Sequence, residues 1–326
     1  MATCLFRSPL AHRLQAFLET CRAGNGDRGF STQKILFYLD RFFTDEMKPG
    51  QPLTREIAER FNKSIAHLST GTRINRICVL RKFCLYLSHF DPRTCVIYRS
   101  YLPRRSRPAP YIYTRKEVRK IMATAQKLGP PGSLRPIVVS TLIGLLYATG
   151  IRIGEALNLT LRDIDLRRRL IEIREGKFKK SRYVPLSLST TNQMRAYLGR
   201  RKRAGFSTAP SAYVFLSMTG KKHVYPSFAT VFLEIVRGLG LRRPKGERGP
   251  RIHDLRHTFA VNRLSVWYRQ GVNLGSKLPL LSTYLGHSTV TGTEVYLHAT
   301  SHLLESAGRR FHARFAVPPV VRDKKP

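Results

Sequence analysis

The sequence has 326 residues, 42% of them hydrophobic, and a formal net charge of +38 from 58 basic and 20 acidic residues. The length favours two domains, and a charge of this size predicts nucleic acid as a partner, ahead of an anionic membrane surface or a merely solvated basic surface. The five cysteines form no CxxC pair and the longest apolar run, residues 137–149, is too short to span a bilayer, which argues against a disulfide framework, a zinc site and a membrane protein.

Residues 1–101 are predicted to form a helical domain. Apolar residues recur at helical spacing within 35–43, 57–68 and 74–87. On the last of these runs, four basic residues lie largely outside the apolar stripe of the helix. This basic face is either exposed to solvent or in contact with a DNA backbone, and the overall charge of the chain favours contact with DNA. These residues are Arg73, Arg76, Arg81 and Lys82. No catalytic cluster occurs in this part, which we interpret as a DNA-binding domain.

Residues 102–113 are predicted to be an extended basic linker between two domains. The stretch LPRRSRPAP, residues 102–110, contains three prolines and three arginines and has no apolar periodicity. Such a segment can cross a phosphate backbone, and Arg104 and Arg105 are the candidate contacts. A nuclear-localisation patch is the competing interpretation, and its motif is weak.

A second domain is predicted to start at Thr114, because Thr114 and Glu117 form the T-x-x-E pattern of a capping box. After a Gly-Pro-Pro-Gly break comes a second, buried helix whose end reads ATGIRIGEALNL, residues 148–159. This segment places Arg152 and Glu155 at positions i and i+3. An arginine at the end of a buried helix is costly unless it is paired or faces a ligand. Glu155 is therefore either its structural partner or a support that holds it toward a phosphate.

Residues 163–187 change to a period of two, which predicts a β-hairpin. The turn between its strands is basic and contains Lys177, Lys179 and Lys180. Lysines at such a tip are solvated by default. A hairpin tip can also reach into a DNA groove, where a lysine can donate a proton to a leaving oxygen. Beyond the hairpin, the pattern indicates a helix, a short extended piece at 213–216 and a further helix.

The stretch from residue 251 to residue 298 gathers side chains that suit an attack on a phosphodiester. His253 and Arg256 are three positions apart, so they project from one face at the start of a helix. His287 follows in the tripeptide Leu-Gly-His, and Tyr296 comes nine positions later. The arginine fork can grip two phosphate oxygens, histidine can move a proton near neutral pH, and tyrosine can hold a phosphoryl group covalently.

Taken in order, these motifs resemble those of the tyrosine recombinases, the integrases and resolvases that cut and rejoin DNA through a phosphotyrosine. The resemblance covers nearly the whole chain and rests on TGIRIGEALNL, GKFKKSRYVPL, HDLRHTFA, LGH and the tyrosine nine residues later. It implies catalytic roles for Arg152, Lys177, His253, Arg256, His287 and Tyr296, with Glu155 as a supporting residue. Lys179 remains an alternative to Lys177, because the hairpin reads GKFKK where a second glycine is frequent. Tyr284 is the competing nucleophile, but it lies on the wrong side of LGH for the family pattern.

The resemblance also implies a fold and a mode of action. The expected fold is mainly α with a small β-sheet. A helical core-binding domain and a catalytic domain, residues 114–315, are expected to form a C-shaped clamp on DNA, and a tail is expected at 316–326. The expected reaction proceeds through a 3′-phosphotyrosine without metal ion, ATP or other cofactor. The expected partner is double-stranded DNA with an inverted-repeat core site, bound by a homotetramer in the cytoplasm, at the nucleoid. Further DNA contacts are expected from Lys179, Lys180 and Arg251.

Three functions remain open at this point. The first is a site-specific recombinase or integrase of a mobile element, because the segment between Arg256 and His287 is longer than is common, which resembles transposon-borne members. The second is a type IB topoisomerase-like enzyme, which uses the same chemistry on one duplex as a monomer. The third is a catalytically silent DNA-binding protein, against which the six intact site residues argue. An RNA-binding protein is less favoured, because no RNA-module signature is visible.

Overall fold

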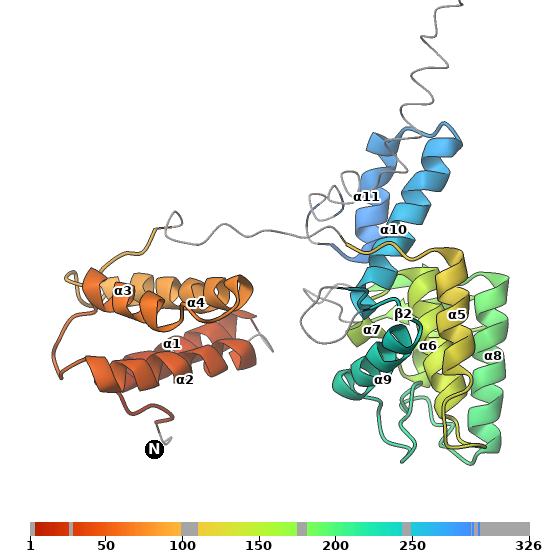
Figure 1. The fold of residues 1–326 in the computed structure, drawn as a ribbon, viewed down its shortest axis with the longest axis horizontal. Coiled ribbons are helices and arrows are strands. Elements are labelled where there is room, and N and C mark those ends of the chain that lie inside the picture. The colour runs from red at the N-terminus through yellow and green to blue at the C-terminus, as the bar shows by residue number, and fades with distance from the viewer. Residues whose placement is uncertain are drawn as a thin grey trace, which may run out of the picture. The chain divides into compact units, whose positions relative to one another are not determined.

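In a computed structural model, the chain forms two compact units, Met1–Pro108 and Ala109–Pro326. The structure describes residues 4–25, 29–98, 110–174, 181–242, 249–287, 289 and 293. Both units are mainly helical, and the second also holds a small sheet (Figure 1). The expected fold class, mainly α with a small β-sheet, is therefore confirmed. Among the described residues, no helix is long and apolar enough to cross a membrane.

The described part of the first unit consists of four helices that share one core. They are α1 (Ala11–Asn25), α2 (Gly29–Glu46), α3 (Arg55–Ser64) and α4 (Thr70–Ser88). Helix α4 packs against the other three. Each helix contributes one buried phenylalanine to the core: Phe17, Phe43, Phe61 and Phe83. The predicted helices are thus confirmed, although α3 ends four residues before the predicted run does, at Ser64 rather than at residue 68.

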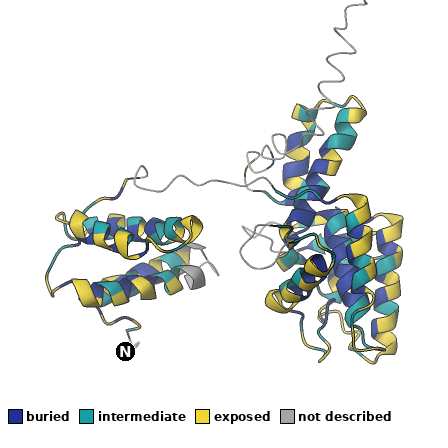
Figure 2. Cartoon of the chain, in the orientation of Figure 1, coloured by how far each residue is buried: buried dark blue, intermediate teal, exposed yellow. Residues whose placement is uncertain are grey.

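The second unit is built around α6 (Arg135–Thr149), which is apolar almost all round and mostly buried. A helix with this pattern belongs in the interior of a domain, because no face of it suits water. It contacts four helices that surround it: α5 (Arg115–Ala125), α7 (Ile153–Asn158), α8 (Leu188–Arg203) and α10 (Ile252–Arg269). Helix α9 (Tyr225–Gly238) packs against α5 and α7. The buried residues gather where these helices face one another (Figure 2).

The start of α5 carries the predicted capping box. The backbone N–H of Glu117 donates to Oγ1 of Thr114 at 3.2 Å, and the backbone N–H of Thr114 donates to Oε2 of Glu117 at 2.7 Å. Two N–H groups that the helix itself cannot satisfy thereby find acceptors. This boundary of the second unit's first helix is therefore confirmed.

The prediction of one buried helix that reaches residue 159 is wrong. Helix α6 ends before Gly150, which has a φ of 65°, and the separate helix α7 begins at Ile153 with Arg152 as its N-cap. Gly150 is required by its left-handed backbone. It is also required by packing, because a Cβ there would lie 2.5 Å from Cδ1 of Phe259. The break places Arg152 at the start of a short helix instead of the end of a long one.

The predicted hairpin is present and belongs to a three-stranded antiparallel sheet of order β1-β2-β3. The strands are β1 (Ile164–Asp165), β2 (Leu170–Ile173) and β3 (Arg182–Pro185). Ile171 pairs with Val184, and both are fully buried, which explains the period of two in the sequence. The basic tip at 175–180 lies outside the described residues. The extended piece predicted at 213–216 forms isolated β-bridges, which confirms it.

Helices α10 and α11 (Leu274–Leu285) form a hairpin with a small core of its own (Figure 1). Apolar side chains from both helices fill this core: Ala260, Val261, Leu264, Leu278, Leu281 and Leu285. Near the start of α10, Ile252 and Leu255 belong instead to the main core around α6. Helix α10 therefore connects the hairpin to the rest of the unit and fixes where α11 ends.

Candidate active site

The C-terminal end of α11 is the point at which the site is assembled. Gly286 has a φ of 67°, and the backbone N–H groups of Gly286 and His287 donate to the carbonyls of Thr283 (2.9 Å) and Ser282 (3.0 Å). This pair of hydrogen bonds is the Schellman motif that commonly closes a helix. The next three carbonyls, those of residues 284–286, need donors from other parts of the chain.

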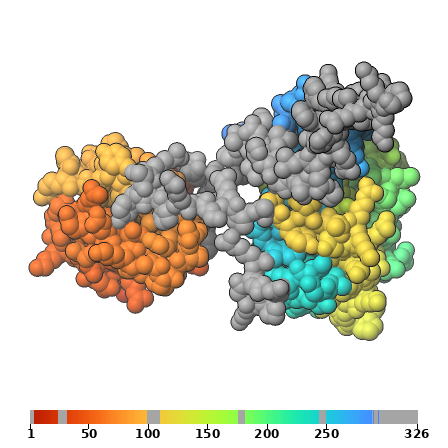
Figure 3. Space-filling model, turned by 45° about the horizontal axis from the view of Figure 1, so that its top comes forward, coloured from red at the N-terminus to blue at the C-terminus, as the bar shows by residue number. Residues whose placement is uncertain are grey.

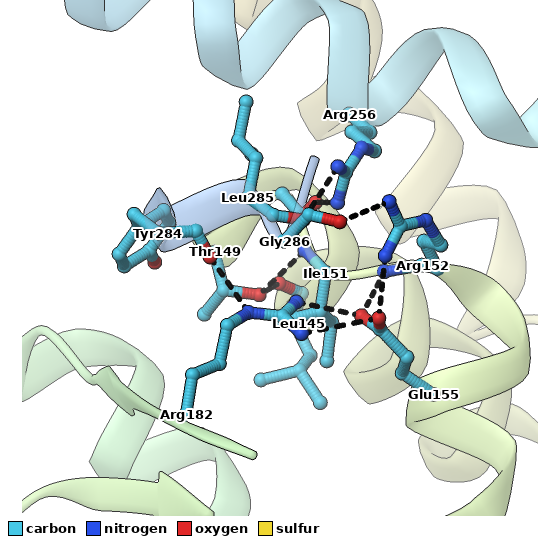
Figure 4. Close-up of polar contacts among 11 residues, drawn as sticks. Leu145, Thr149, Ile151, Arg152, Glu155, Arg182, Arg256, Tyr284, Leu285 and Gly286 are labelled. Atoms are coloured by element: carbon cyan, nitrogen blue, oxygen red, sulfur yellow. Dashed lines mark hydrogen bonds and ion pairs between the residues drawn. The ribbon is translucent and has the colours of Figure 1, made fainter. Parts of the chain in front are cut away.

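Three arginines supply those donors, as Figure 4 shows. Each donates to a different carbonyl oxygen: Arg182 to that of residue 284 (2.7 Å), Arg256 to that of residue 285 (2.6 Å) and Arg152 to that of residue 286 (2.7 Å). The helix dipole places partial negative charge at this end, which favours cations. The arginines come from β3, from α10 and from the N-cap of α7, so one helix end joins segments that are far apart in the sequence.

Gly286 is required here by packing as well as by its backbone conformation. A Cβ at this position would lie 2.9 Å from Nη1 of Arg182 and 3.3 Å from Nη1 of Arg152. A side chain would therefore displace two guanidinium groups and strain a left-handed residue at the same time. The glycine of the LGH motif is thus a structural requirement of the site.

Glu155 lies between Arg152 and Arg182, and its side chain is only 8% exposed. The carboxylate accepts from Nη1 and the backbone N–H of Arg152, at 2.8 Å and 2.9 Å, and from Nη2 and Nη1 of Arg182, at 2.8 Å and 3.2 Å. Burial by itself raises the pKa of Glu155, but hydrogen bonds and charge from Arg182 and Arg152 lower that pKa below its usual value. The pairing of Arg152 with Glu155 is confirmed, and Arg182 is a partner that the sequence analysis missed.

Arg256 is 2% exposed and is held in one orientation by two backbone carbonyls. Besides the carbonyl of Leu285, it contacts that of Gly150, to which Nη1 donates at 2.8 Å. A buried guanidinium is costly unless it is hydrogen-bonded. Arg256 meets this requirement at the left-handed glycine that ends α6 and at the end of α11. It thereby ties together the two turns that position Arg152 and His287.

Three histidines in this region are held in the neutral form. Burial is the largest cause that lowers the pKa of each of His253, His257 and His287 to about 4, and the positive charge of Arg256 is one of the further causes for all three. The rings of His253 and His257 lie 4.7 Å apart, and Nδ1 of His287 lies 2.8 Å from Oγ1 of Thr293. At pH 7 such groups can accept a proton or a hydrogen bond. Within the described residues, no group of three or more His, Cys, Asp or Glu side chains could hold a metal ion.

The structure thus brings together Arg152, Glu155, Arg256 and His287, with His253 on the same helix as Arg256. His257 was missed, although its spacing of four from His253 puts both on one helical face. The remaining predicted residues of the site and of the basic linker lie outside the described residues: Lys177, Lys179, Lys180, Tyr296, Arg104 and Arg105. Their roles stay predictions.

Tyr284 is poorly suited to act as the nucleophile. Its ring stacks on that of Phe259, with the ring centroids 5.5 Å apart. Burial raises the pKa of Tyr284 to about 12, so its hydroxyl is harder to deprotonate than that of an ordinary tyrosine. These features argue against Tyr284 as the nucleophile, and the role of Tyr296 stays a prediction.

The basic residues predicted to contact DNA differ in how they are held. In the first unit, Arg73 donates to an asparagine side chain of α3 at 3.4 Å, Arg76 lies 3.8 Å from the ring centroid of a tyrosine of α2, and Arg81 donates to the carbonyl of residue 97 at 2.9 Å. Lys82 is exposed. Arg251, the N-cap of α10, has a side chain that is 56% exposed and pairs with an aspartate. Their contacts with DNA stay predictions.

Residues 112–302, which include every element of the site, match the model of the phage integrase family. The chain belongs to this family. A protein of Sinorhizobium fredii that bears the name integrase/recombinase y4rB is 33% identical over 312 residues, which cover 94% of this chain and 98% of that protein. Relatives of the chain also include tyrosine recombinases, the family that the motifs of the sequence resemble: XerC of Oceanobacillus iheyensis is 31% identical over 216 residues, which cover 66% of this chain and 65% of that protein.

Two solved structures share the fold. One is the integrase of the transposon Tn1549 in complex with transposon right-end DNA, with a TM-score of 0.67 and 19% identity over 94% of this chain and 99% of that chain. The other is the XerH site-specific recombinase bound to a palindromic difH substrate, with a TM-score of 0.66 and 20% identity over 92% of this chain and 84% of that chain. These similarities show the fold, and the family supports site-specific DNA recombination as the activity of the chain.

Proposed function

We propose that this member of the phage integrase family cuts and rejoins DNA through a covalent bond to Tyr296, with no metal ion and no ATP. The observation that carries this proposal is the convergence of Arg152 and Arg256 on consecutive carbonyls at the end of α11, next to His287. Guanidinium groups held in this way concentrate positive charge where a phosphate can be bound through paired hydrogen bonds.

In the proposed reaction, the phenolic oxygen of Tyr296 attacks the scissile phosphorus. The new bond joins Tyr296 to the 3′-phosphate, and the bond from phosphorus to the 5′-oxygen breaks. A tyrosine hydroxyl has a pKa of about 10, so it must lose its proton as it attacks. Neutral His253 accepts that proton or holds the phosphate, and Lys177, or Lys179 in its place, protonates the leaving 5′-oxygen.

The arginines stabilise the charge that develops on the phosphate. Arg152 and Arg256 donate to its two non-bridging oxygens, and His287 adds a further hydrogen bond. These donors are fixed before the reaction begins, so little reorganisation is needed as charge builds up. The phosphotyrosine conserves the energy of the broken bond, so attack by a free 5′-hydroxyl reverses the step without ATP.

Double-stranded DNA with an inverted-repeat core site is the proposed substrate, and a homotetramer the proposed assembly. The core-binding domain (1–101) and the catalytic domain (114–315), joined by the linker at 102–113, are both proposed to bind this duplex, in the cytoplasm at the nucleoid. The Tn1549 integrase was solved with transposon DNA and XerH with a palindromic site, which supports such a substrate. The former is the integrase of a transposon, which favours a mobile element.

Strand transfer between two different duplexes tests the proposed function. The probe is a duplex that the protein itself selects from a randomised pool, prepared in two lengths with different end labels. A recombinase is expected to form covalent adducts and to join the two labels in one product. Resealing only within one duplex, by a monomer, would indicate a type IB topoisomerase-like enzyme. Binding without any adduct would indicate a catalytically silent DNA-binding protein.

Cleavage is expected to proceed unchanged in excess EDTA, because arginine and lysine supply the positive charge that a metal ion supplies in other phosphoryl-transfer sites. The measurement is the initial rate of adduct formation on the selected duplex with and without the chelator. A magnesium-dependent nuclease in the same buffer is the positive control for chelation. Loss of adducts that Mg²⁺ restores would contradict metal independence.

A further inference from the structure

Arg182, the first residue of β3, has no part in the proposed reaction, yet it lies inside the site. Its side chain is 11% exposed. Nε donates to the carbonyl of Tyr284, while Nη1 and Nη2 donate to the two carboxylate oxygens of Glu155 (Figure 4). Each of its three guanidinium nitrogens donates to an acceptor of the protein itself, two of them to one carboxylate, so Arg182 ties Glu155 to the end of α11.

The charge of Glu155 is shared between two arginines. One carboxylate faces the guanidinium groups of Arg152 and Arg182, so the group of three carries a net charge of +1 (two positive, one negative). Without Arg182, Glu155 would pair with Arg152 alone, and the net charge beside the phosphate would fall to zero. Because charges interact strongly in a partly desolvated site, this difference bears directly on how well Arg152 can stabilise an anion.

Arg182 also fixes the turn that carries His287. The carbonyl of Tyr284 is one of those that the Schellman motif leaves to outside donors, and Arg182 is its donor at 2.7 Å. The guanidinium lies directly against Gly286, as the 2.9 Å separation from a Cβ built there indicates. Movement of this turn would shift His287 together with the carbonyl that Arg152 contacts.

We propose that Arg182 is a positioning residue for strand cleavage: it shares the Glu155 carboxylate with Arg152 and holds the turn at 284–287, so that Arg152 and His287 meet the scissile phosphate in their reactive arrangement. This inference rests on the proposed function. Arg182 acts through these two neighbours and does not bind the phosphate. The role needs the planar fork of arginine, because lysine provides the charge but cannot span a carboxylate and a carbonyl in one plane.

The test compares Arg182→Gln and Arg182→Lys with the wild type on a nicked form of the selected duplex. Arg168→Gln is the matched control, because its side chain is 82% exposed in the turn between β1 and β2, and its loss removes the same charge. Single-turnover cleavage rates, DNA affinity at several salt concentrations and thermal melting are measured for each variant. Rates are compared at a temperature at which all the variants are folded. If Arg182→Gln does not fold, the comparison of Arg182→Lys with the wild type is the test.

Arg182→Gln is expected to slow cleavage by up to about 10²-fold, the effect of a displacement of about 1 Å at a reacting group. Arg182→Lys is expected to lie between Arg182→Gln and the wild type, and Arg168→Gln to cleave at the wild-type rate. DNA affinity and its salt dependence stay at wild-type values in the Arg182 variants. A slope of log affinity against log salt that falls by about 0.9 would mean that Arg182 contacts a phosphate, which overturns the proposal.

A double-mutant cycle with Glu155→Gln tests whether Arg182 acts through Glu155. Once the carboxylate is neutral, Arg182 no longer balances its charge, so Arg182→Gln is expected to slow cleavage less in this background than in the wild type. Losses that simply multiply would mean independent action and would overturn the proposal. If the wild type forms no adduct, the proposed function fails; if it forms adducts and a folded Arg182→Gln variant cleaves equally fast, only the positioning role fails.

Discussion

Replacing Tyr296 by Phe is expected to abolish covalent protein–DNA adducts while leaving DNA binding intact. The substitution removes a single oxygen, the nucleophile of the proposed reaction, and keeps the aromatic ring. Adducts on a nicked form of the selected duplex are measured by denaturing electrophoresis, and binding is measured separately by mobility shift. The effect is expected to be complete, because no other step of the reaction can form the protein–DNA bond.

Tyr284→Phe is the matched control for this experiment. The stacking of its ring on Phe259 is retained in the variant, and its hydroxyl, with a pKa raised to about 12, has no role in the proposed attack. This variant is expected to form adducts at the wild-type rate. Adducts that persist in Tyr296→Phe and vanish in Tyr284→Phe would reverse the assignment of the nucleophile.

Arg152→Ala is expected to lower the cleavage rate by about 10²–10³, or roughly 2.7–4 kcal/mol of transition-state stabilisation, by analogy with the loss of one oxyanion-hole donor. The expected loss of DNA affinity is much smaller, because one phosphate contact among many contributes little to the affinity for a whole duplex. Single-turnover rates and dissociation constants on the same duplex separate the two effects.

The control for Arg152→Ala is Arg168→Ala, which removes one positive charge from an exposed turn of the same unit. It is expected to affect neither cleavage nor binding beyond a small change in salt dependence. If Arg152→Ala lowers the cleavage rate and the DNA affinity by equal factors, Arg152 is an ordinary phosphate contact and not a residue that stabilises the transition state. Thermal melting of both variants shows whether the loss of the Glu155 pair has destabilised the fold.

The parts of the structure that the sequence predicted well are those that depend on neighbouring residues. The capping box at Thr114 and Glu117 closes within one helical turn, and the alternation around Ile171 reflects a strand with one buried face. Arg152 and Glu155 are three residues apart, so their pairing could also be anticipated. In each of these cases the interacting groups are close in the sequence, and spacing alone is informative.

The parts that the sequence did not predict depend on contacts between distant segments. Arg182 meets Glu155 across 27 positions and the carbonyl of Tyr284 across 102, so nothing near it in the sequence marks its role. The break after α6 was missed because apolar periodicity continues past Gly150, whereas the need for glycine there comes partly from Phe259 on another helix. Such contacts become visible only when the fold is known.

The end of α11 also has a consequence for how the site comes apart. Helix ends commonly fray, because their last carbonyls are exposed to water and lose few hydrogen bonds to the protein when the turn opens. Here, release of the final turn would remove one acceptor from each of three arginines at once, one of them almost fully buried. Since the loss of an acceptor by a buried cation is unfavourable, opening at this point is expected to be cooperative with the unfolding of the surrounding unit. The amide protons of this turn are then expected to exchange with solvent as slowly as those of the core.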